Sequence, residues 1–108
     1  MKNNQQSTSN NLLLCEEVKT TVHRLKTWSE FFVPLSSGKK TFEVRKNDRE
    51  FKVGDVLILE EFDPEKNCHT GQNESFRVTY ILPGGQFGID PDFVVLAIKP
   101  SSHLNKLT

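Results

Sequence analysis

The stretch from residue 38 to 55, GKKTFEVRKNDREFKVGD, most constrains the fold, because a short alternating run lies in it between two turn signals. Phe42 and Val44 are apolar, and the residues on either side of each are polar. This period of two is typical of a half-buried β-strand. We therefore expect Phe42 and Val44 to face the core. The polar residues share the opposite face: Thr41, Glu43 and Arg45.

That polar face has two interpretations. It is either a solvated surface with cross-strand ion pairs, the commoner fate of such residues, or a surface that presents polar groups to a ligand. Lys40 lies three residues before Glu43, so the two side chains point to opposite faces of an ideal strand. A bend at the start of the strand would bring them together, and a lysine and a carboxylate can then act as an acid–base pair. Lys40 and Glu43 are therefore the candidate catalytic residues.

The composition sets limits on the class of protein. At 108 residues, the chain has the length of one domain with a modest core. No apolar run approaches the roughly 20 residues that span a bilayer, and the first residues, MKNNQQSTSNN, lack the pattern of a secretory signal. We expect a cytoplasmic protein with no membrane partner. Cys15 and Cys68 have no metal-ligand spacing, and we expect no metal site, no cofactor and no structural disulfide.

The net charge is zero, but the charges are unevenly distributed. Residues 19–52 contain nine basic and four acidic side chains, a net charge of +5, whereas residues 53–77 contain two basic and six acidic ones, a net charge of −4. The basic half either offers a face to a phosphate-bearing ligand or is attracted to the acidic half.

Short strands separated by turns predict an α+β fold, a compact β-barrel of five or six strands with a short helix capping one end. The strands are expected at residues 20–28, 41–45, 56–59, 75–82 and 93–98. Ser29 is the expected helix N-cap, and Pro34 limits the helix to a turn or two. We expect a disordered or loosely ordered tail at residues 1–18, the folded domain at 19–100 and a C-terminal tail at 101–108.

Two further patterns concern individual side chains. In the expected strand at 75–82, alternation places Phe76, Val78, Tyr80 and Leu82 on one face, and residues 63–71 have the composition of a hairpin loop.

Aromatic residues among the basic ones either stack on RNA bases or form the core. We expect the core for Phe31, Phe32, Phe42 and Phe51, and leave Trp28 open as a stacking residue. His23 is either a ligand-binding residue or a hydrogen-bonded strand residue.

Several segments together resemble a known family. In order these are HRLKTW at residues 23–28, SGKKTFEVRKNDREFKVGD, LEEFDP, HTG, VTYIL and FVVLAI. They resemble the small bacterial and phage family DUF3850, which is grouped with ASCH domains in the PUA-like superfamily, and the similarity covers about residues 21–98. The resemblance implies a PUA-like (ASCH-type) β-barrel with a cleft between barrel and helix, lined by the strand after Gly38.

The resemblance also implies a function. ASCH-like domains bind RNA or nucleotide-like ligands in that cleft, and one single-domain branch hydrolyses the amide of N4-acetylcytidine with a lysine, a threonine and a downstream glutamate. Lys40 matches the lysine, and Glu74 is the nearest candidate for the downstream acid. Glu43 stands at the position of the threonine, so the presumed nucleophile is missing.

We therefore expect a binding module for RNA or a modified nucleoside or nucleotide, as a monomer. Arg45 and a lysine would meet phosphate or base oxygens, and Glu43 would accept hydrogen bonds from base amino groups. The alternatives are an amidohydrolase acting on a small acylated nucleoside, and a phage or bacterial protein-interaction module. The candidate ligand-binding residues are His23, Lys26, Trp28, Lys39, Lys40, Thr41, Glu43, Arg45, Asn47 and Arg49.

Overall fold

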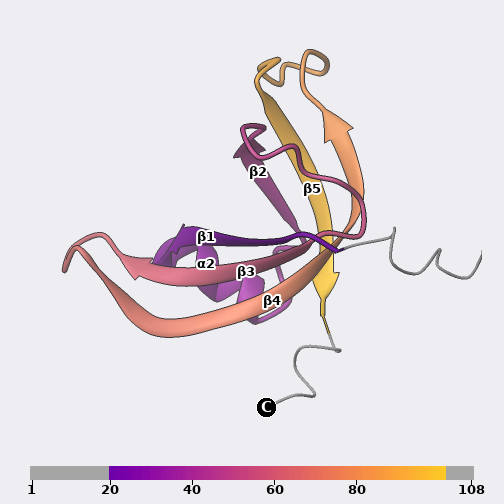
Figure 1. Cartoon of the computed structure of the whole chain (residues 1–108). Helices are drawn as coiled ribbons and strands as arrows, with labels where there is room; N and C mark the ends of the chain where they lie inside the picture. The colour runs from indigo at the N-terminus through magenta and orange to yellow at the C-terminus, as the bar shows by residue number, and fades with distance from the viewer. Residues whose placement is uncertain (1–19, 102–108) are drawn as a thin grey trace, which may run out of the picture.

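The computed structural model of the chain describes residues 20–101, which form one mixed sheet and one short helix. The elements are β1 (Val22–Trp28), α2 (Ser29–Ser36), β2 (Phe42–Lys46), β3 (Val56–Asp63), β4 (Cys68–Pro83) and β5 (Phe93–Pro100). The strand order is β1-β3-β4-β5-β2, with β1 parallel to β3 and the other neighbouring pairs antiparallel. The sheet curls into a half-barrel (Figure 1), and α2 packs against β1 and β3. The expected α+β, barrel-like fold is confirmed at this level.

The half-barrel is open along one side. β1 and β2 are the two edge strands, and in residues 20–101 no strand pairing joins them. Side chains cross the opening instead: Arg45 Nη2 donates to Thr27 Oγ1 at 3.1 Å, and Arg49 Nη1 donates to the carbonyl oxygen of Arg24 at 3.4 Å. We call this opening, between residues 24–27 and 45–49, the seam. Within residues 20–101, the two edge strands are thus linked by hydrogen bonds from side chains and not by a backbone ladder.

The core lies on the concave side of the sheet. Three residues of the apolar run in β3 are buried, since Val56, Leu57 and Leu59 are each at most 3% exposed, whereas Ile58 is half-buried. The helix contributes Leu35, and the last strand contributes the alternate residues Val94, Leu96 and Ile98. The main cluster consists of Leu25, Leu35, Phe51, Leu57, Leu59, Phe76, Val78, Val94, Leu96 and Ile98.

A β-bulge in β4 changes the predicted alternation. The register with β5 shifts between Val78 and Tyr80. A bulge adds one residue to one strand, so every later side chain changes face. Phe76 and Val78 are buried as predicted, whereas Tyr80 is 63% exposed and Ile81 packs against the core in its place. The prediction that Tyr80 shares the buried face is therefore wrong.

Several boundaries of the helix, strands and tails differ from those predicted. Trp28, not Ser29, is the helix N-cap, and no side chain there makes a capping hydrogen bond. The hairpin predicted at residues 63–71 is a shorter turn, because β4 already begins at Cys68. Ser101, assigned to the C-terminal tail, is buried, and its N–H donates to the Ser75 carbonyl at 2.9 Å. The tails predicted at 1–18 and 102–108 lie outside the described residues.

Asp55 joins the loop before β3 to β1. Its Oδ2 accepts hydrogen bonds from His23 Nε2 at 2.8 Å and from the Lys52 N–H at 2.9 Å, and both His23 and Asp55 are buried. The His23 ring also packs at 4.8 Å from the Phe51 ring. This is a buried polar contact within the fold, and it accounts for the histidine without any ligand.

Replacing Asp55 with alanine is expected to lower the free energy of unfolding by about 1–3 kcal/mol, because two donors lose their acceptor. Urea denaturation followed by circular dichroism measures the change. The control is Asp48→Ala, which removes an exposed carboxylate three residues after Arg45. Equal unfolding midpoints for the two variants would show that the His23–Asp55 contact does not stabilise the fold.

Candidate functional site

A cavity of about 580 Å³ opens at the seam, a volume within the range of small-molecule sites. It is lined by residues of β1, α2, the segment before β2 and β2 itself: Lys26, Thr27, Trp28, Phe31, Lys40, Phe42, Glu43, Val44 and Arg45. Consecutive residues of a strand point to opposite faces. Since four consecutive residues of β2 line the cavity, it extends over the free edge of that strand.

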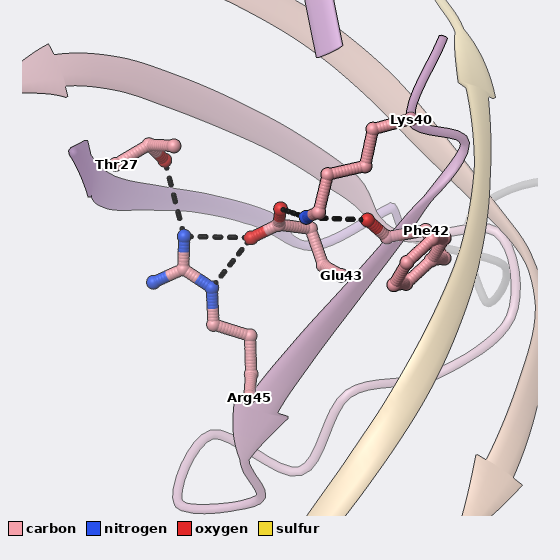
Figure 2. Close-up of polar contacts among 5 residues, drawn as sticks. All are labelled: Thr27, Lys40, Phe42, Glu43 and Arg45. Carbon is pink, nitrogen blue, oxygen red and sulfur yellow. Dashed lines mark hydrogen bonds and ion pairs between the residues drawn. The ribbon is translucent and has the colours of Figure 1, made fainter. Parts of the chain in front are cut away.

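Glu43 lies at the centre of the polar contacts in this cavity (Figure 2). Its side chain is only 4% exposed. Lys40 Nζ donates to Oε2 at 2.7 Å, and Arg45 Nε and Nη2 both lie 2.8 Å from Oε1. Arg45 Nη2 also reaches Thr27 on β1, across the seam. A buried carboxylate requires such compensation, because an unpaired buried charge is strongly destabilising.

The end of α2 places Lys40 beside Glu43. Gly38 has a φ of +84°, and its N–H donates to the Leu35 carbonyl at 3.2 Å, while the N–H groups of Lys39 and Lys40 donate to the Pro34 carbonyl at 2.9 and 3.0 Å. This is a Schellman motif, in which a glycine with positive φ ends the helix and reverses the chain. Lys40 therefore precedes β2, and its Nζ bonds the Phe42 carbonyl at 2.9 Å as well as Glu43. The bend expected from the sequence is present.

The two faces of β2 are the reverse of those predicted. Glu43 is 3% exposed, whereas Phe42 and Val44 are 44% and 51% exposed. Glu43 pairs in register with Leu96 of β5, which is fully buried, and directly opposed residues point to the same side of a sheet. The prediction that Phe42 and Val44 face the core is therefore wrong. Alternation divides a strand into two faces, but the curl of the whole sheet decides which face is concave.

Three aromatic rings form the apolar wall of the cavity. Trp28, Phe31 and Phe42 are each between 44% and 47% exposed. Lys40 Nζ lies 4.9 Å from the centre of the Phe42 ring and 5.8 Å from that of Phe31, within the range of cation–π attraction. The core assignment is wrong for Phe31 and Phe42. It is confirmed for two other phenylalanines, Phe32 and Phe51.

The structure brings half of the predicted ligand-binding residues to this cavity. Those that line it are Lys26, Trp28, Lys40, Glu43 and Arg45. Four more residues line it and were not predicted to bind a ligand: Thr27, Phe31, Phe42 and Val44. Thr27 and Phe31 lie close to the predicted Trp28 in the sequence.

The other predicted residues are not among those that line the cavity: His23, Lys39, Thr41, Asn47 and Arg49. His23 is buried against Asp55, and Arg49 contacts β1 further along the seam. Asn47 donates its N–H to the Asp92 carbonyl at 2.8 Å. Glu74, the candidate downstream acid, accepts a hydrogen bond from Ser36 Oγ at 2.7 Å and does not line the cavity either.

A second cavity of about 310 Å³ lies on the outer part of β3 and β4, and it is lined by Glu60, Glu61, His69, Gly71, Gln72 and Asn73. Within residues 20–101, no three His, Cys, Asp or Glu side chains are grouped so that they could hold a metal ion. Over the same part of the chain, no helix has the length and apolar character needed to cross a bilayer.

Comparison with known proteins assigns the chain to a family. The model of DUF3850, described as a "Domain of unknown function", matches residues 22–98, from the first residue of β1 into β5. The chain belongs to the DUF3850 family. The match includes all the residues that line the larger cavity, so this site lies wholly within the DUF3850 domain.

A similar protein is encoded by Escherichia phage P2, where it is described as an "Uncharacterized 12.9 kDa protein in GpA 3'region". The two are 36% identical over 58 residues, which is 54% of this DUF3850 chain and 51% of the phage protein. The similar segment thus spans about half the length of each protein.

Proposed function

We propose that this DUF3850 domain is a PUA-like binding module that takes a nucleobase of single-stranded RNA or of a nucleotide derivative into the cavity at the seam. The observation that carries the proposal is the combination of half-exposed aromatic rings with a buried, ion-paired polar cluster in one cavity. The PUA-like assignment is supported by the five-stranded half-barrel and by a cavity between its edge strands and the helix.

The aromatic wall suits a flat ring. Bases that are free of a duplex stack on exposed aromatic side chains, and such stacking contributes about 1–3 kcal/mol per base. Trp28, Phe31 and Phe42 come from three successive parts of the chain and still line one cavity. Rings left half-exposed around a concave site are typical of a binding surface rather than of a core.

The polar cluster supplies hydrogen-bond donors beside that wall. Lys40 Nζ uses two of its three donors within the protein, and Arg45 Nη1 bonds none of the residues drawn in Figure 2. Glu43 already accepts three contacts, so most of its acceptor capacity is used. We therefore assign the polar contacts with the ligand to Lys40 and Arg45, and assign Glu43 the role of positioning them.

Replacing Trp28 with alanine tests the proposal. We expect binding to weaken about tenfold or more, because the stacking contribution of one ring is lost. Fluorescence anisotropy with labelled single-stranded RNA oligomers, and calorimetry with the common nucleosides and nucleotides, measure the affinity. The matched control is Tyr80→Ala, which removes another exposed aromatic ring that does not line the cavity.

Two results would overturn the proposal. One is the absence of binding by the unaltered protein to any RNA, nucleoside or nucleotide tested. The other is an equal loss of affinity in the Trp28→Ala and Tyr80→Ala variants, which would place the binding surface elsewhere.

One observation favours a second candidate function, an amidohydrolase acting on a small acylated nucleoside. Lys40 Nζ lies 2.7 Å from Glu43 Oε2, a distance at which a proton can pass between an acid and a base. Incubation with a panel of acylated nucleosides, followed by chromatography, would detect the deacylated product. Binding without turnover across the panel would rule out the amidohydrolase and leave the binding module as the remaining proposal.

A further inference from the structure

We propose that the ligand of the cavity carries a phosphomonoester next to its base, either on a free nucleotide or at the phosphorylated end of an RNA. This inference rests on the proposed function and specifies the chemical class of its ligand. It is based on the balance of charges and hydrogen-bond donors in the cavity.

The residues that line the cavity carry an excess of positive charge. Three of them are cationic, Lys26, Lys40 and Arg45, and one is anionic, Glu43. The net charge of the empty cavity is therefore +2. A nucleoside is uncharged and would leave this charge uncompensated beside an apolar wall, where electrostatic interactions are stronger than in bulk water. A phosphomonoester carries about −1.5 to −2 at neutral pH, which matches the excess, whereas an internal phosphodiester carries only about −1.

The donors that remain unpaired in the cavity also require an acceptor-rich group. Lys40 retains one donor, and Arg45 Nη1 points away from Glu43 in Figure 2. Lys26 Nζ lies 4.3 Å from the centre of the Phe62 ring, and within residues 20–101 it forms no ion pair with a carboxylate. Three phosphate oxygens would accept from such donors, as phosphates commonly do from arginine and lysine.

The two kinds of group lie close enough for one small ligand. Lys26 and Trp28 are two residues apart on β1, so their side chains share one face of the strand. The Lys26 side chain therefore leaves β1 on the same face as Trp28, with its ammonium over the Phe62 ring of β3. A base stacked on the aromatic wall would carry its phosphate toward Lys26 and Arg45.

Calorimetry with matched ligands tests the inference. The ligands are the four common nucleosides, their 5′- and 3′-monophosphates, and a trinucleotide RNA with a 5′-phosphate or a 5′-hydroxyl. For the base that binds best, we expect a monophosphate to bind at least tenfold more tightly than its nucleoside, or the phosphorylated RNA to bind at least tenfold more tightly than the hydroxyl form. Tight binding of the free monophosphate identifies a small-molecule ligand, and a preference seen with the RNA alone identifies an RNA end.

The variant Lys26→Ala is expected to reduce this phosphate preference about tenfold while binding of the nucleoside changes little. The matched control is Lys52→Ala, an exposed lysine beside Asp55, at the opposite end of β1 from Trp28. Equal affinity for the phosphorylated and unphosphorylated forms would overturn the inference and leave the proposed function intact. A phosphate preference that survives Lys26→Ala would overturn the assignment to this cavity. Failure of every ligand to bind would overturn the proposed function itself.

Discussion

The Glu43→Ala variant is expected to lower the free energy of unfolding by about 3–5 kcal/mol, which is the typical cost of removing one partner from a buried ion pair. Lys40 and Arg45 would both lose their carboxylate, and Arg45 would lose the contact that holds it in position to reach Thr27. Denaturation in urea, followed by circular dichroism, measures the change.

One further variant shows whether the effect arises from the charge of Glu43 or from its shape, and another serves as the control. Glu43→Gln keeps the shape of the side chain and one carbonyl oxygen, so we expect it to recover part of the lost stability. Glu65→Ala removes an exposed carboxylate from the turn after β3 and is expected to change stability by less than about 0.5 kcal/mol. A Glu43→Ala protein as stable as Glu65→Ala would show that the buried cluster contributes nothing to the fold.

Leu96→Ala is expected to cost about 2–5 kcal/mol, the range found when a buried leucine is truncated in a packed core. Leu96 is fully buried on β5, and it pairs in register with Glu43 on one side and with Ile81 on the other. The cavity left by the truncation would therefore lie next to the buried carboxylate. Unfolding in urea measures the loss.

The matched control for Leu96 is its neighbour Val95, which is half-buried on the opposite face of β5. Val95→Ala is expected to destabilise the domain by a smaller amount, because fewer buried contacts are lost. If the two variants were equally stable, the concave side of the sheet would not be the core.

Local sequence patterns were sufficient to predict where the strands lie. The apolar run at 56–59 became the first half of β3, and the apolar run at 93–98 became most of β5. The sequence also raised the pairing of Lys40 with Glu43 as the result of a bend before the strand, and the structure supplies that bend at Gly38. Each of these features depends on residues close together in the chain, whose propensities and turn chemistry can be read directly.

Features that depend on distant residues were not predictable in this way. Glu43 faces inward because β2 pairs with β5 at the edge of a curled sheet, so its environment is determined by Leu96, more than fifty residues later. The exposure of Tyr80 depends on a bulge against β5, and a one-residue insertion leaves no signature in the hydrophobic pattern. His23 acquired its partner Asp55 only through the parallel pairing of β1 with β3.

The open seam has a mechanical consequence for recognition. Widening the gap between β1 and β2 stretches the Arg45–Thr27 and Arg49–Arg24 contacts but breaks no rung of the sheet. The two edges of the site are linked across the seam by hydrogen bonds from side chains, whereas the strands behind them are paired through their backbones. Under the proposed function, a wider seam would admit a two-ring purine as well as a one-ring pyrimidine.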